Sequence, residues 1–362
     1  MKFETPEGGP YLMAHSVGLL PEGARDVLAS GVLDPWAHKG EAWAEWLTAI
    51  DRFRDAIASL TGGKRADICP QANVSSGLFA LLTGMPLEKG RNVILASALS
   101  FPSIGFAAGN LERLGLSLRL LPEDRSPADP QVWADAMTGD VAAVIVMHVH
   151  SNSGVVAPVA DICAQAKARG VFAIVDVAQS SGVLAVDPAG WGAGAVIGSC
   201  LKWLCGGPGA GWLWADPAAT RDFRPLHVGW FSHDNPFAFD IRDFRYAPDA
   251  RKFWGATPTV APFALATAGI EGVVKAGVDK VRAHNRHLIA RVADAAPRWT
   301  DQLDRTGKGG TICLQAGTET DAIQARLIAA DCRFDRRSDT LRLSFHLWNS
   351  EADADIVANC LR

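Results

Sequence analysis

Residues 171–215, VFAIVDVAQSSGVLAVDPAGWGAGAVIGSCLKWLCGGPGAGWLWA, decide the fold. Two apolar runs in this stretch, 172–175 and 193–197, have the length and β-branched content of buried parallel strands. Each run leads to a polar residue that a hydrophobic core would reject. Asp176 directly follows the first run, and Lys202 follows the second after a few residues. The stretch therefore predicts an α/β fold with parallel strands.

The positions of Asp176 and Lys202 indicate a cofactor. In an open α/β sheet the carboxyl ends of neighbouring strands border one crevice, so both side chains are expected to face the same ligand. Lysine forms a Schiff base with the aldehyde of pyridoxal 5'-phosphate (PLP), and a carboxylate keeps the pyridine nitrogen protonated. Lys202 is then placed to move the Cα proton of an amino acid. The alternative is a turn or helix cap for Asp176 and a solvated side chain for Lys202.

The composition excludes several classes of protein. Hydrophobic residues make up 48% of the 362 residues and charged residues 20%, as in an ordinary globular enzyme. A net charge of −4 provides no electrostatic footprint for nucleic acid. The seven cysteines lack the spacing of zinc ligands or of a disulfide framework, so no metal is expected. Because no secretion signal or long uncharged apolar segment is visible, we expect a cytoplasmic protein without a membrane partner.

The apolar periodicity predicts alternating helices and strands, which favours a doubly wound sheet. Before the central stretch, we expect helices at 21–30, 41–60, 78–82 and 158–168, and strands ending at Cys69 and covering 92–96 and 141–147. After it, we expect helices at 260–277, 278–295, 321–330 and 351–361, and strands at 311–315 and 341–345. The expected domains are an N-terminal arm (1–14) joining a small domain (281–362), and a large domain (15–280).

Several motifs carry a family resemblance. The segments DVAQ at 176–179, LKWLCGGPG at 201–209 and GWF at 229–231, with His233 and the pair PF at 236–237, resemble the class V aminotransferase group of fold-type I PLP enzymes, and kynureninases most of all. The resemblance runs from about Tyr11 to Leu347. It implies a mostly parallel sheet of the seven-stranded type between helices, a small α+β C-terminal domain, an α-amino acid as substrate, and PLP as cofactor.

The resemblance also implies a set of cofactor contacts. Ser75 matches the phosphate-binding Thr or Ser of the family, although it and Ser76 could simply cap the helix that follows. Phe101 matches the ring that stacks on the pyridine, and His150 stands where relatives place Asn near the 3′ oxygen. The implied cofactor-binding residues are Val74, Ser75, Ser76, Phe101, Ser103, His150, Asp176, Gln179, Lys202, Trp230 and Thr257.

Two of these contacts imply a homodimer with a shared active site. Trp230 matches an indole that binds the cofactor phosphate in kynureninases, and Thr257 matches a phosphate ligand that the partner subunit contributes. For the substrate, Arg342 matches the family's carboxylate-binding arginine, whose planar fork suits bidentate binding. Arg337 is a second candidate for this role, and Arg342 could alternatively be a plain outward-facing strand residue. His15 and Ser16 match a polar position close to the substrate.

Departures from the family pattern bear on the reaction. Leu201 stands where kynureninases have a tyrosine that assists proton transfer, and Gln179 stands where they have His and cysteine desulfurases have Gln. Transamination needs little beyond Lys202, so we expect an amino-acid aminotransferase, with a kynureninase-like lyase cutting at Cβ as the alternative. A desulfurase would need Cys332 on a mobile loop ahead of Arg342. A catalytically silent PLP-binding module is a fourth reading.

Overall fold

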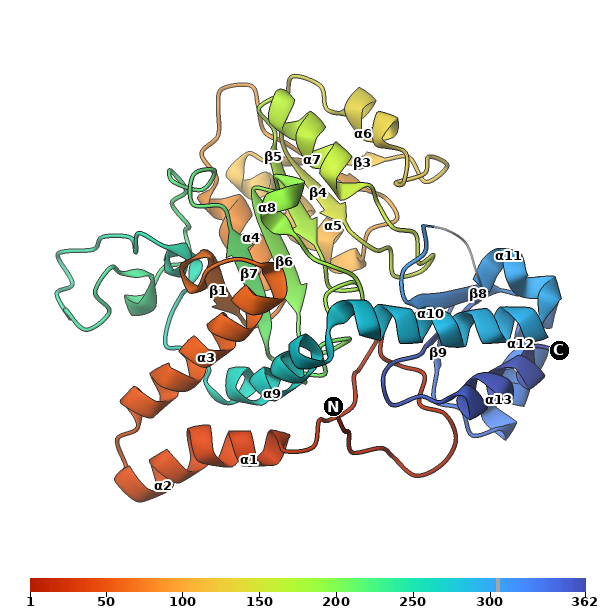
Figure 1. Cartoon of the computed structure of the whole chain (residues 1–362). Helices are drawn as coiled ribbons and strands as arrows, with labels where there is room; N and C mark the ends of the chain where they lie inside the picture. The colour runs from red at the N-terminus through yellow and green to blue at the C-terminus, as the bar shows by residue number, and fades with distance from the viewer. Residues whose placement is uncertain (304–306) are drawn as a thin grey trace.

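A seven-stranded sheet forms the centre of the computed structural model, which describes residues 1–303 and 307–362 (Figure 1). Its strand order is β1-β7-β6-β5-β4-β2-β3. The pairs from β6 to β3 are parallel, whereas β7 runs antiparallel to β6 and β1. The expected mostly parallel seven-stranded sheet is therefore confirmed. The strands are β1 (Ile68–Gln71), β2 (Val93–Ser97), β3 (Ser117–Leu121), β4 (Val141–Met147), β5 (Phe172–Asp176), β6 (Ala195–Ser199) and β7 (Gly211–Ala215).

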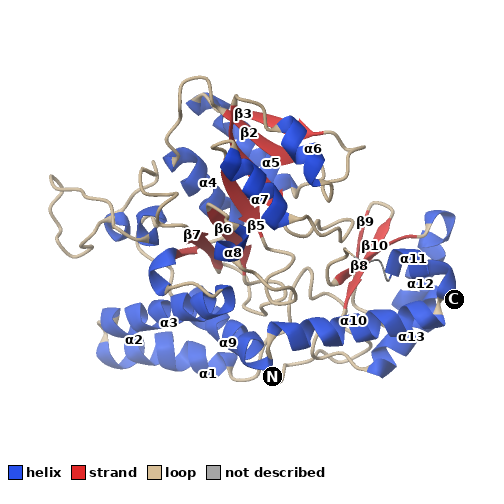
Figure 2. Cartoon of the chain, turned by 45° about the horizontal axis from the view of Figure 1, so that its top comes forward, coloured by secondary structure: helices blue, strands red, loops and turns tan. Residues whose placement is uncertain are grey.

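Helices cover both faces of this sheet (Figure 2). Right-handed crossovers place α4 and α5 on one face and α6, α7 and α8 on the other, because the chain first progresses towards the β3 edge and then turns back. The helices of this part are α3 (Trp43–Thr61), α4 (Val74–Gly84), α5 (Pro102–Gly109), α6 (Pro130–Ala136), α7 (Val159–Ala168), α8 (Pro188–Trp191) and α9 (Ala261–Ala276). Nearly all residues of β2, β4, β5, β6 and β7 are buried, which explains their continuous apolar sequences.

A second, three-stranded antiparallel sheet lies beside the large one. Its order is β8 (Thr311–Gln315), β10 (Thr340–Ser344) and β9 (Asp335–Arg337). The helices packed with it are α10 (Val278–Ala295), α11 (Thr300–Leu303), α12 (Thr320–Ala329) and α13 (Glu351–Leu361). Leu12 of the N-terminal arm belongs to this second hydrophobic core, and its backbone bonds Arg333 and Ser344. The arm therefore lies on the small sheet, and the domain limits near 14 and 280 stay predictions.

Several segments differ from the expected elements. The helix predicted at 21–30 is a succession of α1 (Ala24–Leu28), the π-helical turn η1 (Ala29–Leu33) and α2 (Asp34–Lys39). The strand predicted to end at Cys69 begins at Ile68 instead, because Asp67 accepts the Lys64 N–H at 3.1 Å and closes a 3-10 turn. The 3-10 turns are η2 (Arg65–Asp67), η3 (Asn110–Leu114), η4 (Trp230–Ser232), η5 (Ala250–Phe253), η6 (Pro297–Trp299) and η7 (Gly317–Glu319).

In the described residues, no single helix is long and apolar enough to cross a membrane. Helices α9 and α10 satisfy the length and composition requirement only when taken together, and they are bent by 79° relative to each other.

Candidate active site

Asp176 and Lys202 lie together at the carboxyl edge of the large sheet. Asp176 is the last residue of β5 and is buried, and its Oδ1 accepts the Ala178 N–H at 2.8 Å. Burial raises the pKa of this carboxyl group, and the Ala178 N–H and Lys202 oppose that shift. Lys202 lies in the turn after β6, the strand that pairs with β5. The two side chains are thus close enough to interact electrostatically, as their positions in the sequence predicted.

The amine of Lys202 is easier to deprotonate than an ordinary lysine. Burial lowers its pKa to about 8, Asp176 acts in the opposite direction, and Arg337 and Arg342 lower it further. The Nζ atom lies 5.7 Å from the centre of the Phe101 ring. A substantial fraction of the amine is therefore neutral slightly above neutral pH, as a base or nucleophile requires.

The backbone around Lys202 is held by the segment that follows the N-terminal arm. The Gly18 N–H donates to the Leu201 carbonyl at 2.8 Å. A Cβ on Gly18 would come within 2.2 Å of the Lys202 carbonyl oxygen, so only glycine fits this close approach. His15 and Ser16 are thereby brought to the crevice, although they precede Lys202 by more than 180 residues.

The N-terminus of α4 opens on the same edge of the sheet, because β1 runs in the same direction as β6. Asn73 caps the helix by accepting the Ser76 N–H at 2.9 Å, and the Ser76 hydroxyl bonds the Asn73 carbonyl and Gln71 Oε1. The cap residue of α4 is therefore Asn73 rather than Ser75 or Ser76, and Ser76 completes the capping box by accepting the Asn73 N–H at 3.3 Å. Ser75 and its neighbour Val74 are half-buried, and in the described part of the chain the Ser75 hydroxyl has no hydrogen bond.

Two buried polar atoms of the predicted site residues lack a partner within residues 1–303 and 307–362. His150 Nδ1 contacts the Leu99 carbonyl at 3.1 Å, but its Nε2 is unpaired. Gln179 Nε2 donates to the His15 carbonyl at 3.1 Å, but its Oε1 is unpaired. An unpaired buried polar atom costs about 1–3 kcal/mol. The crevice is therefore suited to a polar ligand.

Phe101 occupies the N-cap position of α5, and its ring lies near two cationic side chains. Lys202 Nζ and the Arg337 guanidinium lie 5.7 Å and 5.5 Å from the centre of its ring. Ser103, in the first turn of α5, is half-buried. Ile104, the next residue, is buried in the hydrophobic core.

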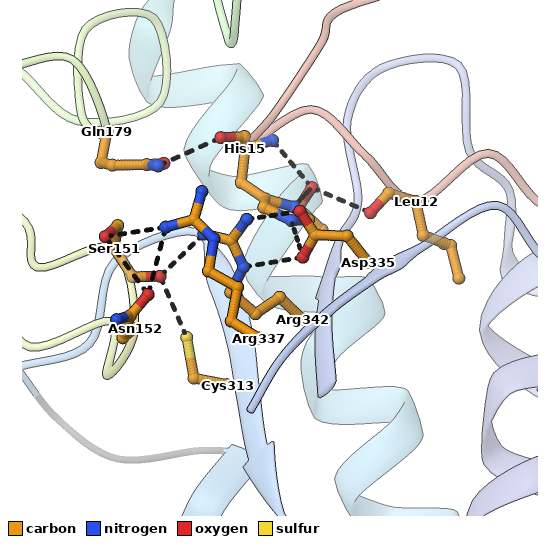
Figure 3. Close-up of polar contacts among 10 residues, drawn as sticks. Leu12, His15, Ser151, Asn152, Gln179, Cys313, Asp335, Arg337 and Arg342 are labelled. Carbon is orange, nitrogen blue, oxygen red and sulfur yellow. Dashed lines mark hydrogen bonds and ion pairs between the residues drawn. The ribbon is translucent and has the colours of Figure 1, made fainter. Parts of the chain in front are cut away.

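The small sheet contributes an ionic cluster to the crevice (Figure 3). Asp335 binds Arg342 through both of its oxygens, at 2.7 Å from Nε to Oδ1 and in a second, shorter contact from Nη2. Its Oδ1 also lies 3.3 Å from His15 Nε2. Burial alone would raise the pKa of Asp335, but its bonds to His15 and Arg342 hold that pKa well below the usual range. The carboxylate therefore stays charged and joins His15, just after the N-terminal arm, to Arg342 of β10.

Arg342 is fully buried, so the outward-facing alternative is wrong. The alternation of apolar residues suggested an exposed face, but all five residues of β10 are buried because the Ser151 loop covers the opposite face. Sequence analysis missed Asp335 and Ser151. The sequence offered one indication of Asp335: it stands two residues before Arg337, so on a strand the two side chains share a face.

Trp230 and Thr257 bond each other. Trp230 Nε1 donates to Thr257 Oγ1 at 3.2 Å. The indole packs against Trp43, Phe231 and Phe239. In the described parts of this single chain, neither side chain bonds any other residue of the predicted set, and their assignment to a shared site stays a prediction.

Three buried histidines make the fold sensitive to acid. Burial lowers the pKa values of His15, His148 and His346 to about 4. The unfolded chain therefore binds more protons than the folded chain between pH 6.5 and 4, so the free energy of unfolding falls as the pH falls through this window. Each histidine contributes about 1.4 kcal/mol per pH unit. We expect chemical denaturation at pH 7, 6 and 5 to show this decline.

A variant pair tests this expectation. His346→Gln can keep the bond to the Trp203 carbonyl, which lies 3.1 Å from Nε2. The slope of its free energy of unfolding against pH is expected to be smaller, because about one proton fewer is taken up on unfolding. His38→Gln, on the exposed face of α2, is expected to keep the wild-type slope. Equal slopes in wild type and His346→Gln would contradict the assignment.

Comparison with known proteins identifies sequence and structural relatives. The family model described as aminotransferase class-V matches residues 38–296. A kynureninase of Deinococcus radiodurans is 30% identical over 281 residues, which cover 75% of this chain and 67% of that protein. A kynureninase of Pseudomonas fluorescens is 28% identical over 286 residues, covering 75% of this chain and 66% of the relative.

Solved structures share the fold. A C-DES mutant with glycine covalently linked to its PLP cofactor superposes with a TM-score of 0.87 at 19% identity, covering 98% of this chain and 97% of the other. The apo cysteine desulfurase of Thermococcus onnurineus NA1 gives a TM-score of 0.82 at 19% identity, covering 97% and 93%. At this level of identity, the structural likeness establishes the architecture alone.

Proposed function

This chain belongs to the class V aminotransferase family of PLP-dependent enzymes, and we propose on that premise that it is a lyase cleaving an α-amino acid at Cβ, in the manner of a kynureninase. The observation that carries the proposal is the 30% identity to a kynureninase over 281 residues. The expectation of an aminotransferase reaction thus becomes the second candidate, and the alternative becomes the first.

The crevice fits PLP in the chemistry of its donor groups. Lys202 would hold the aldehyde carbon, and the Asp176 carboxylate would face the pyridine nitrogen. Ser75 and the N-terminal N–H groups of α4 would hold the phosphate, since the start of a helix favours an anion. Phe101 would stack on the ring, and His150 Nε2 and Gln179 Oε1 are the unpaired polar atoms available to it. When bound, PLP withdraws electrons from the substrate's Cα.

Three residues of the chain have separate roles in the proposed reaction. Lys202, with a pKa of about 8, takes and returns the proton at Cα. Asp176 is buried, and its carboxylate would supply a negative charge to the pyridine nitrogen in surroundings that exclude water. His15, whose pKa is about 4, is neutral at pH 7 and bonds Ser344 Oγ at 2.7 Å through Nδ1. Its ring therefore holds the segment that follows the N-terminal arm against β10 without adding charge to the site.

Transamination is kept as a second candidate because of Leu201. Kynureninases carry a tyrosine at this position, and neither tyrosine of this chain can replace it. The Tyr11 hydroxyl donates to the Val17 carbonyl and that of Tyr246 donates to the Pro225 carbonyl, each at 3.0 Å. A transaminase needs only Lys202 for its proton transfer, so the missing phenol would not affect it.

Desulfurase chemistry is not proposed. Cys332 is buried in the second hydrophobic core, and burial raises its pKa to about 12. Cys313, which faces Arg342 across the small sheet, has a pKa raised to about 11. A thiol in such surroundings is rarely a thiolate, and the thiolate is the nucleophile.

The reactions of the holoenzyme with kynurenine and with amino acids distinguish the two candidates. A Cβ lyase is expected to release anthranilate from kynurenine, detected by its fluorescence, without an added keto acid. Conversion of the cofactor to its pyridoxamine form by other amino acids, with no anthranilate from kynurenine, would instead establish transamination. The Lys202→Ala protein is the control for uncatalysed release.

We also propose a homodimer in which the Trp230 and Thr257 region completes the partner's site. The segment around them extends from the large domain in Figure 1 and exposes Phe239 and Ile241, at 77% and 98%. Sedimentation of the holoenzyme is expected to give a dimer, and Phe239→Asp is expected to yield monomers with weakened PLP binding. Ile328→Asp, at an apolar position on α12 that is 60% exposed, is the control. A wild-type monomer that binds PLP tightly would refute the shared site.

A further inference from the structure

The residue that directly follows Lys202 is buried where the large sheet meets the small one. The indole of Trp203 has no exposed surface and lies in a small hydrophobic cluster with Ala14 and Val281. A Cβ on Gly310, the residue before β8, would come within 2.6 Å of the indole, so this close approach requires glycine. The ring thus packs against the small sheet, while its backbone belongs to the turn of the large sheet that carries the reactive lysine.

Two kinds of contact hold the backbone of this turn. The Cys205 N–H donates to the Lys202 carbonyl at 2.9 Å and closes the turn from within. From outside, His346 Nε2 lies 3.1 Å from the Trp203 carbonyl. The Cys205 thiol also lies 3.8 Å from this carbonyl, but a thiol is a weak donor. Of the two donors, His346 is the stronger, and it follows β10 of the small sheet.

The surroundings of His346 fix its proton and its orientation. A carbonyl oxygen can only accept, so Nε2 is the nitrogen that carries the hydrogen. The other nitrogen, Nδ1, is buried and has no partner in the described part of the chain. The ring stacks on Trp348, with centres 4.4 Å apart and an angle of 17° between the planes, and Phe3 meets it edge-on at 5.9 Å. These two rings hold the N–H group in one direction.

A change in the Trp203 carbonyl is expected to reach the lysine amine. Because Trp203 directly follows Lys202, a displacement of its backbone also displaces the Lys202 side chain. A displacement of about 1 Å can cost about 10²-fold in rate, even when the altered residue lies outside the reacting groups. The charged side chains that act on the amine are Asp176, Arg337 and Arg342. None of them is part of the contact between His346 and Trp203, so this contact can be altered with the charges of the site unchanged.

We propose that His346 is a positioning residue for Lys202: its Nε2–H holds the Trp203 carbonyl, and this bond makes the orientation of the lysine amine depend on the placement of the small sheet. The inference rests on one part of the proposed function, the assignment of Lys202 as the anchor of PLP. It does not depend on which bond of the substrate is cleaved.

The test measures how fast the Lys202 amine reacts with PLP. Full-length protein is freed of cofactor with hydroxylamine, PLP is added, and the growth of the visible absorption band is followed between pH 7 and 10. His346→Phe keeps a ring against Trp348 but has no N–H. It is expected to form the band about tenfold or more slowly at pH 8, because the amine is misplaced. The midpoint of its pH profile is expected to rise from about 8 towards that of an ordinary lysine, because a looser turn admits water.

Two further variants separate positioning from stability. His346→Gln keeps an N–H without the ring and is expected to restore most of the wild-type rate, because its amide can donate to the same carbonyl. His284→Leu is the matched control, since it removes a bond of 3.0 Å to the Asn349 carbonyl in the same loop. It is expected to lower the melting temperature and to keep the wild-type rate and midpoint. Thermal melting establishes that each variant is folded in the assay, and the smaller His346→Leu replaces His346→Phe if the latter does not fold.

Three results would overturn the proposal. The first is a wild-type rate and midpoint in His346→Phe. The second is an equal loss of rate in His346→Phe and His284→Leu, which would trace the effect to the stability of the loop. The third is a rate in His346→Gln as low as in His346→Phe, which would assign the effect to the ring instead of the N–H.

Failure of the proposed function gives a different result. If wild-type protein forms no visible band with PLP, or if Lys202→Ala still forms it, the assignment of the anchor is wrong. A protein that forms the band but releases no anthranilate from kynurenine refutes the proposed lyase, and the slower band formation of His346→Phe would still establish the positioning role.

Discussion

Replacing Lys202 by alanine is expected to abolish the visible absorption of the holoenzyme and to lower turnover by about 10³-fold or more. The residue would be both the covalent anchor of PLP and the base at Cα, and proton transfer by a positioned side chain alone contributes about 10²–10⁴-fold. Burial lowers the pKa of the amine to about 8, so protonation of this amine does not stabilise the folded state. Absorption spectra and turnover measure the two effects.

A second buried lysine provides the control. Lys252 donates to the Thr220 carbonyl at 2.7 Å and lies 5.7 Å from the centre of the Phe253 ring. Lys252→Met is expected to lower the melting temperature while preserving the visible band. Added methylamine is expected to restore part of the activity of Lys202→Ala, because a small amine can occupy the space of the missing one. A Lys202→Ala protein with wild-type spectrum and turnover would disprove the assignment of the cofactor site.

Asp176→Asn is expected to reduce turnover by about 10²–10³-fold. An amide has nearly the same shape but cannot carry the negative charge that keeps the pyridine nitrogen protonated. Loss of one partner of a buried ionic pair costs about 3–5 kcal/mol, and each 1.4 kcal/mol corresponds to a factor of ten. The fold is expected to persist, because the asparagine Oδ1 can still accept the Ala178 N–H.

The matched control is Asp187→Asn, which removes a carboxylate from an exposed helix cap. Asp187 accepts the Gly190 N–H at 2.9 Å, and asparagine is an equally good cap residue. This variant is expected to keep wild-type turnover and a wild-type cofactor spectrum. If Asp176→Asn also kept both over the whole pH range, the carboxylate would have no role beside the pyridine nitrogen.

Local sequence was sufficient for the regular elements with strong periodicity. Val141–Met147, Val278–Ala295, Thr311–Gln315 and Glu351–Leu361 have the expected bounds. These segments are continuously apolar or have one apolar face, so burial and local propensity agree. Edge strand β3 escaped prediction because four of its five residues are partly or fully exposed, and β9 because its sequence is Asp-Arg-Arg.

The sequence by itself determined that this chain forms a mostly parallel α/β sheet and that Asp176 and Lys202 follow neighbouring strands, because both conclusions depend on residues close together in the chain and on the general rule that parallel strands share a carboxyl edge. Only the tertiary structure decided which side chains of the small sheet are already paired. Asp335 lies opposite Arg342 because of the strand register, and His15, more than 300 residues away in the chain, contacts the same carboxylate. The pattern of apolar residues marks buried positions, but it carries no information about which partner a buried charge finds there.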